Sequence, residues 1–218
     1  MQEVIRLIVT AYSYERYIMN EYSITEPNGN KGNTVTPNKP PKSKLRQVID
    51  TIVYFFIVFF VVILIQRFII QPVEVDGASM EPTLYNADHV LLEKVSYLFS
   101  NPKRFDVIVF RPEEDKDLYY IKRVIGLPGE RVRIEDSIIY INGEPLLENY
   151  GLENVIYDPG IAAIEITLGE EEYFVLGDNR NRSKDSRNSS VGKVKKESIL
   201  GRAWFTIWPI NDFGTVKH

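Results

Sequence analysis

Three segments beyond residue 75 combine side chains that could do chemistry. In the first, residues 76–84 (DGASMEPTL), Ser79 follows two small residues and precedes a Met-x-Pro sequence. Small neighbours allow a sharply turned backbone to approach a substrate, and an exposed serine in such a turn can act as a nucleophile. Taken alone, Ser79 fits an ordinary turn better.

The second segment, residues 119–129 (YYIKRVIGLPG), places Lys122 inside an otherwise apolar strand pattern. Alternation puts Tyr120, Lys122 and Val124 on one face of the strand. An exposed lysine, with a pKa of about 10.4, is neutral only about 0.04% of the time at pH 7. Apolar surroundings favour the neutral amine, which is a general base. The alternative is that Lys122 and Arg123 lie at a strand edge and reach water.

The third segment, residues 177–187 (GDNRNRSKDSR), contains no apolar side chain. Such a segment is either a solvated loop or a dense hydrogen-bonded network. Asp178, Arg180, Asp185 and Arg187 supply two carboxylates and two guanidiniums, which are able to brace neighbouring strands.

The composition narrows the choice of catalytic groups. The 218 residues include no cysteine and only two histidines, His89 and His218. Disulfides, thiolate nucleophiles and Cys-ligated metal sites are therefore excluded. Two histidines also provide few residues for a His-rich metal site or a Ser-His-Asp triad. We expect no metal and no cofactor, and a serine nucleophile would use a lysine base, a known alternative to the triad. The net charge of −4 argues against a general nucleic-acid-binding protein.

A long apolar run at residues 52–70 precedes these segments, and its only polar side chains are Tyr54, Gln66 and Arg67. It predicts one permanent transmembrane helix within residues 47–71, with a buried core helix as the alternative. A cleaved signal peptide is disfavoured, because the run starts some 50 residues into the chain and no small-x-small cleavage pattern follows it.

The charges on either side of this run predict its orientation. Residues 27–49 carry five basic and no acidic side chains, whereas residues 71–218 carry 18 Lys and Arg against 25 Asp and Glu, a net charge of −7. By the positive-inside rule, residues 1–46 form a cytoplasmic tail with a flexible linker, and residues 72–218 form an exported domain.

The exported part shows short apolar runs separated by Gly, Pro, Asn and Asp, without long amphipathic patterns. We expect it to be mainly β, a compact barrel or folded sheet behind the single helix. The dipeptide Asn142-Gly143 follows one apolar run and predicts a hairpin. The predicted strands are residues 88–92, 107–110, 119–125, 131–134, 138–141, 172–176 and 202–208.

From about residue 45 to 210, the chain closely resembles the bacterial type I signal peptidases, in their compact Gram-positive-like form. The resemblance rests on four motifs that follow the predicted anchor in the same order as in that family, and on a fifth motif near the carboxyl end. They are SMEPT (79–83), RFDVIVF (104–110), YIKRVIGLPGE (120–130) and GDNRNRSKDSR (177–187), followed by GRAWFTIWP (201–209).

The resemblance implies that Ser79 is the acyl-forming nucleophile and Lys122 its general base. The backbone N–H of Ser79 would bind the oxyanion, because Gly77 stands where some members carry a serine donor. The positions implied to support the dyad, a hydroxyl that orients the amine and two ion pairs, are Ser183, Asp178 with Arg123, and Asp185 with Arg187.

The implied reaction is the removal of signal peptides from exported preproteins at the outer face of the cytoplasmic membrane, after small residues in an Ala-x-Ala-like pattern. An extended substrate would add to the strands before Ser79 and Lys122, so that its first and third side chains before the cut share one face. The expected partners are these signal peptides, the lipid bilayer and nearby export machinery, with no nucleic acid. The positions implied to contact the substrate are Val73, Val75, Met80, Leu84, Tyr120 and Ile121.

Two other interpretations stay open at this point. One is another Ser/Lys peptidase of the same broad clan, either an organelle inner-membrane peptidase or a self-cleaving repressor. The anchor with its basic flank disfavours the repressor, which would also need a DNA-binding module that the sequence does not reveal. The other is a membrane-anchored β domain without enzymatic activity, which would use the polar loop for binding.

Overall fold

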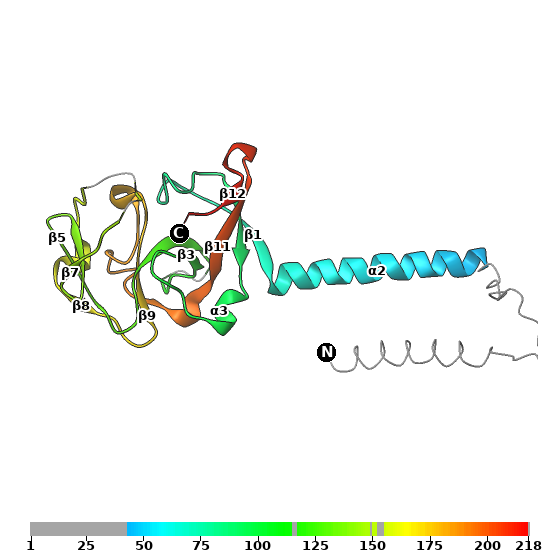
Figure 1. The fold of residues 1–218 in the computed structure, drawn as a ribbon, viewed down its shortest axis with the longest axis horizontal. Helices are drawn as coiled ribbons and strands as arrows, with labels where there is room; N and C mark the ends of the chain where they lie inside the picture. The colour runs from blue at the N-terminus through cyan, green and yellow to red at the C-terminus, as the bar shows by residue number, and fades with distance from the viewer. Residues whose placement is uncertain (1–42, 115–116, 149, 152–154, 218) are drawn as a thin grey trace, which may run out of the picture. The chain divides into compact units, whose positions relative to one another are not determined.

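The structure is a computed structural model that describes residues 43–114, 117–148, 150–151 and 155–217 (Figure 1). The predicted cytoplasmic tail and linker at residues 1–46 therefore lie almost wholly outside the described residues. The domain boundaries drawn from the sequence remain predictions.

The apolar run forms one continuous helix, α2 (Lys44–Phe68). Its 25 residues correspond to about 37 Å at 1.5 Å per residue, which exceeds the hydrocarbon core of a bilayer. By length and composition the helix could cross a membrane, and none of its side chains is buried inside the protein. The alternative of a buried core helix is therefore wrong.

The larger of two sheets is antiparallel throughout and runs in the order β1-β2-β11-β3-β4-β9-β10, with β12 paired to β11. In the described part of the chain the order ends at β1 and β10, which do not pair with each other, so the sheet is open. Its strands are β1 (Ile70–Glu74), β2 (His89–Glu93), β3 (Val107–Phe110), β4 (Tyr120–Gly126), β9 (Glu172–Leu176), β10 (Val194–Lys195), β11 (Ile199–Trp208) and β12 (Gly214–Thr215).

The smaller sheet has the order β7-β6-β5-β8, and Figure 1 shows β5, β7 and β8 grouped on one side of the β region. The predicted hairpin is present, because Asn142 and Gly143 both have positive φ angles, of 54° and 89°, and connect β6 to β7. The strands are β5 (Arg131–Glu135), β6 (Ile138–Ile141), β7 (Glu144–Pro145) and β8 (Ile166–Thr167).

Short helical turns connect several of the strands. They are α3 (Ser96–Phe99), η1 (Gly160–Ala163), η2 (Arg180–Arg182), η3 (Lys196–Ser198) and η4 (Ile210–Asp212).

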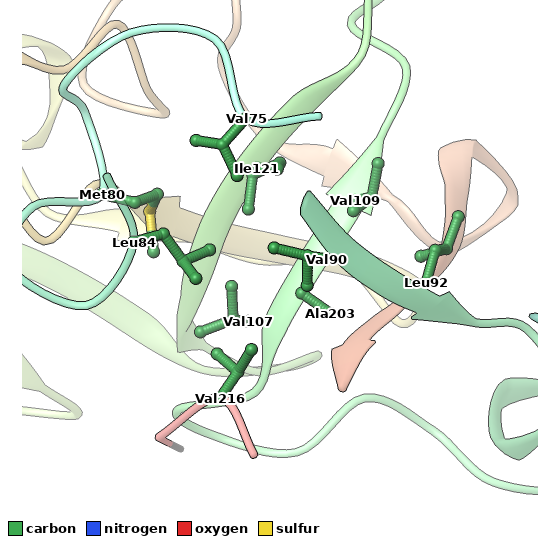
Figure 2. Packing of buried hydrophobic residues seen from close by; sticks show 10 residues of the cluster. All are labelled: Val75, Met80, Leu84, Val90, Leu92, Val107, Val109, Ile121, Ala203 and Val216. Atoms are coloured by element: carbon green, nitrogen blue, oxygen red, sulfur yellow. The ribbon is translucent and has the colours of Figure 1, made fainter. Parts of the chain in front are cut away.

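Three apolar clusters form the interior of the β region. The cluster that positions the site combines side chains from the segment after β1 with side chains from β2, β3, β4 and β11 (Figure 2). Met80 and Leu84 are each 1% exposed, so the segment after β1 is fixed to the core at two points.

The mainly β fold expected from the sequence is confirmed, and each predicted strand is present with ends shifted by at most three residues. The two-residue strands β7, β8, β10 and β12 were not predicted, because so few residues show no measurable alternation.

Candidate active site

Ser79 lies on a turn whose neighbouring side chains Met80 and Leu84 pack into the apolar core. The backbone N–H groups of Thr83 and Leu84 both donate to the carbonyl of Met80, which closes one helical turn directly after the serine. Met80 and Leu84 point into the core, whereas Ser79 itself is only half-buried. The sequence thus folds into a rigid turn whose apolar side chains face inward and whose hydroxyl stays accessible.

Lys122 reaches this turn from β4, although the two residues are 43 positions apart in the chain. Its Nζ lies 2.8 Å from Ser79 Oγ and also donates to the carbonyl of Ile121 at 2.8 Å. The ring of Tyr120 lies beneath the amine, with its centroid 5.4 Å from Nζ. The alternative of a strand-edge lysine reaching water is wrong, because Lys122 is only 4% exposed.

This burial changes the proton affinity of the amine. Removal from water disfavours the charged form and lowers the pKa of Lys122 to about 8, while the carboxylates of Asp185 and Asp178 act in the opposite direction. At pH 7 a group with this pKa is neutral about 9% of the time. A deprotonated amine at hydrogen-bond distance from a hydroxyl can accept its proton.

A buried ion pair lies directly beside the lysine on β4. Arg123 Nε donates to Asp178 Oδ1 at 2.8 Å, and Arg123 Nη2 donates to Asp178 Oδ2 at 2.6 Å, with both side chains at most 1% exposed. The hydroxyl of Thr83 donates to the same carboxylate at 2.5 Å. Asp178 therefore links β4, the serine turn and the polar loop at one point.

A second ion pair lies within the polar loop itself. Arg187 donates to both carboxylate oxygens of Asp185, at 2.8 and 2.9 Å, and both side chains are buried. The backbone N–H of Gly177 also donates to Asp185, at 3.1 Å. The segment 177–187 is thus a hydrogen-bonded network and not a solvated loop.

Comparisons with known proteins show the family to which the chain belongs. The family described as signal peptidase, peptidase S26, matches residues 48–208. A probable signal peptidase I-2 from Synechocystis sp. is 38% identical over 155 residues, or 69% of this chain and 68% of that protein. A signal peptidase I from Bacillus amyloliquefaciens is 33% identical over 185 residues, or 82% of this chain and 98% of that protein. The chain belongs to the signal peptidase S26 family.

As a family member the chain is a serine endopeptidase of the signal peptidase I type, and its family is membrane-associated and removes signal peptides. The interpretation as a non-enzymatic β domain is therefore set aside. A crystal structure of a signal peptidase I from Enterococcus faecalis V583 is 38% identical and covers 47% of this chain and 97% of that chain, with a TM-score of 0.38.

One hydrogen bond expected of this signal peptidase is not present. Ser183 was predicted to orient the Lys122 amine, yet its buried Oγ has no hydrogen-bond partner among the described residues. The recorded partners of the amine are Ser79 Oγ and a backbone carbonyl. Ser183 instead packs beside Gly177, where a Cβ would lie 2.2 Å from its Oγ.

Gly77, where some family members carry a serine that donates to the oxyanion, has free space around it in this signal peptidase. Gly77 has a φ of +90°, and a Cβ built there would meet no atom within 4 Å. Its N–H is engaged with Asn86 Oδ1 at 2.7 Å. Among the described residues the N–H of Ser79 makes no hydrogen bond to a backbone carbonyl.

The residues expected to contact substrate gather in one place. All of them except Tyr120, which is half-buried, belong to the apolar cluster of Figure 2 or pack against it. Met80 and Leu84 form the interior of that cluster, so the structure places them below the surface next to Ser79. These predicted positions are Val73, Val75, Met80, Leu84, Tyr120 and Ile121.

Two residues of the site were not singled out from the sequence. Thr83 donates to Asp178 across a separation of 95 residues in the chain. Gly177 allows the polar loop to approach the serine turn, because a Cβ there would lie 2.4 Å from the carbonyl oxygen of Ser79. For Gly177 a sequence signal existed, because a glycine stands at the first position of the polar segment 177–187.

Proposed function

We propose that this signal peptidase cleaves signal peptides by a Ser79 nucleophile and a Lys122 general base. The observation that carries the proposal is the 2.8 Å separation between Ser79 Oγ and Lys122 Nζ, at an amine that is 4% exposed. A buried amine with a pKa near 8 supplies the neutral base that a lysine on the surface would not.

The proton then moves between these two atoms. Neutral Lys122 accepts the proton of the Ser79 hydroxyl as Oγ attacks the carbonyl carbon of the scissile peptide, and the backbone N–H of Ser79 donates to the developing oxyanion. The Lys122 ammonium returns the proton to the leaving amine, which yields an acyl-enzyme. Water activated by the same amine then releases the signal peptide and regenerates the serine.

The sheet offers two backbone edges to an extended substrate. Among the described residues, β1 is an edge strand that pairs only with β2. Residues 120–122 of β4 pair with β3 on one side, while the pairing with β9 begins at Arg123. Strand addition between these edges would turn alternate substrate side chains toward the apolar cluster. We infer that its two accepting positions are small, so that Ala-x-Ala-like sites are cleaved.

The proposed location of the enzyme rests on the helix α2 and on the charges beside it. In this proposal residues 1–46 are cytoplasmic, residues 47–71 cross the cytoplasmic membrane, and residues 72–218 form the extracytoplasmic peptidase domain, close to the export machinery. The helix α2 has the required length, and the five basic residues on its amino-terminal side favour this orientation.

The decisive experiment is cleavage of a preprotein with an Ala-x-Ala site by the full chain in detergent–lipid micelles. Ser79→Ala and Lys122→Met are expected to abolish processing, while the matched variants Ser189→Ala and Lys195→Met, both at exposed positions, process normally. Unchanged processing by either Ser79→Ala or Lys122→Met would refute the dyad.

A further inference from the structure

The short helix α3 presents two large apolar side chains to the outside. Leu98 is 74% exposed and Phe99 is 85% exposed, and they are consecutive residues of one helical turn. The side chain of Tyr97, by contrast, packs against the interior cluster and donates to Asp106 at 2.8 Å. The inward tyrosine fixes which way the turn faces.

The turn is held rigidly in this orientation. The carboxylate of Glu93 accepts the N–H groups of Val95 and Ser96 at 2.6 and 2.7 Å, which secures the start of α3. At its end, both the N–H and the hydroxyl of Ser100 donate to the carbonyl of Ser96. A braced turn that keeps two apolar side chains in water is costly unless they meet an apolar phase.

Contacts with the carboxyl end of α2 place this turn near the end of the anchor. The backbone N–H of Lys94 donates to the carbonyl of Ile69 at 3.0 Å, and Lys94 Nζ donates to the carbonyl of Arg67 at 3.4 Å. Ser96 follows Lys94 by two residues, a reach of at most about 7 Å. That distance is comparable to the thickness of one interfacial layer of a bilayer, roughly 6 Å.

The charges around the turn complete the pattern. Lys94 and Lys103 lie on either side of the turn, whereas Arg104 is paired with Glu130. Cations beside an aromatic and an aliphatic side chain are typical of segments that enter the headgroup layer of anionic membranes.

We propose that α3 is a second membrane contact, whose Leu98 and Phe99 enter the outer leaflet beside the exit of α2 while the flanking cations meet anionic headgroups. The inference rests on the proposed anchoring of α2. It would fix the height of the sheet above the bilayer, because β2 connects directly to α3 and β1 connects directly to α2.

The absence of cysteine allows a direct test with the full chain. Single variants Phe99→Cys, Leu147→Cys and Ile57→Cys are labelled with an environment-sensitive nitrobenzoxadiazole dye and reconstituted in phosphatidylcholine–phosphatidylglycerol vesicles. Leu147, at 88% exposure, is the matched control away from the anchor, and Ile57 lies in the middle of α2. Quenching by lipids spin-labelled on the acyl chain is measured for each.

The label at residue 99 is expected to emit at shorter wavelength and to be quenched at least about threefold more than the label at 147, as for side chains just below the headgroups. Equal, weak quenching at 99 and 147 with strong quenching at 57 would overturn the inference and leave the anchor intact. A wavelength shift at 99 without quenching would also overturn it, because the label would then lie against protein and not lipid. Weak quenching at 57 would refute the anchor itself.

Discussion

The protonation of Lys122 should control the rate of this enzyme across the neutral and alkaline range. With a pKa of about 8, the neutral fraction is about 9% at pH 7, which is roughly 200-fold more than for an ordinary lysine. For a peptide substrate without titratable groups, kcat/KM should therefore rise about tenfold per pH unit below pH 8 and level off above it.

The assay is the pH dependence of kcat/KM for an Ala-x-Ala peptide, followed from about pH 6 to about pH 10. The variant His89→Gln is the matched control, because His89 is the single histidine among the described residues. It should keep the wild-type profile. A flat profile, or an inflection that disappears in His89→Gln, would refute the assignment of the base.

The burial of Lys122 should also make the free energy of unfolding depend on pH. Because the folded-state pKa of Lys122 is lowered, the unfolded chain binds more protons between about pH 8 and 10.5, and stability should rise with pH through that window. The full effect is about 3 kcal/mol, at 1.36 kcal/mol per unit of pKa. Lys122→Met should therefore be inactive yet more stable than wild type at pH 7, with a difference that shrinks toward pH 10.5 in chemical unfolding.

Three further variants test the contacts around the dyad. Gly177→Ala should lower kcat by roughly 100-fold or more, because its Cβ would displace the serine turn. Gly169→Ala is the matched control and should keep normal activity, because the contacts of its Cβ are with the flexible side chain of Glu172. Equal activity of the two variants would contradict the close approach of Gly177 to the serine turn. Thr83→Val should lower kcat about tenfold with little change in KM, and Thr83→Ser should restore it, since only the hydroxyl reaches Asp178. Asp178→Asn should lower the free energy of unfolding by about 3 kcal/mol in urea titrations, because it leaves the buried charge of Arg123 unpaired; a loss below about 1 kcal/mol would contradict this.

Much of the scaffold could be predicted because it depends on local chemistry. A short apolar run identified the strand that carries Lys122, and the dipeptide Asn142-Gly143 identified a hairpin, since both signals act over a few residues. The turn at Asp136 and Ser137 is a hairpin of the same kind, with φ angles of 49° and 66°, and it was missed because its sequence is a weaker turn signal.

The contacts of the site could be predicted only in part, because they join distant segments. Thr83 is an ordinary residue of its turn until β4 and the polar loop bring Asp178 to it. The hydroxyl of Ser183 illustrates the opposite case, in which a position is implied by resemblance but its rotamer and contacts depend on packing against Gly177. Sequence motifs place residues near a site, whereas hydrogen bonds depend on tertiary packing.

The two ion pairs around the proposed base solve an electrostatic problem of the Ser/Lys dyad. A histidine base in a triad is helped by a carboxylate, but a lysine must lose its charge first, and an unpaired carboxylate beside it would keep the proton on Nζ. Asp178 and Asp185 both raise the pKa of Lys122, yet each is held by a guanidinium through two hydrogen bonds, from Arg123 and Arg187. The recorded hydrogen-bond partners of Nζ among the described residues are neutral oxygens, a hydroxyl and a carbonyl. The two ion pairs can therefore brace the polar loop and β4 while burial still dominates the proton affinity of the amine.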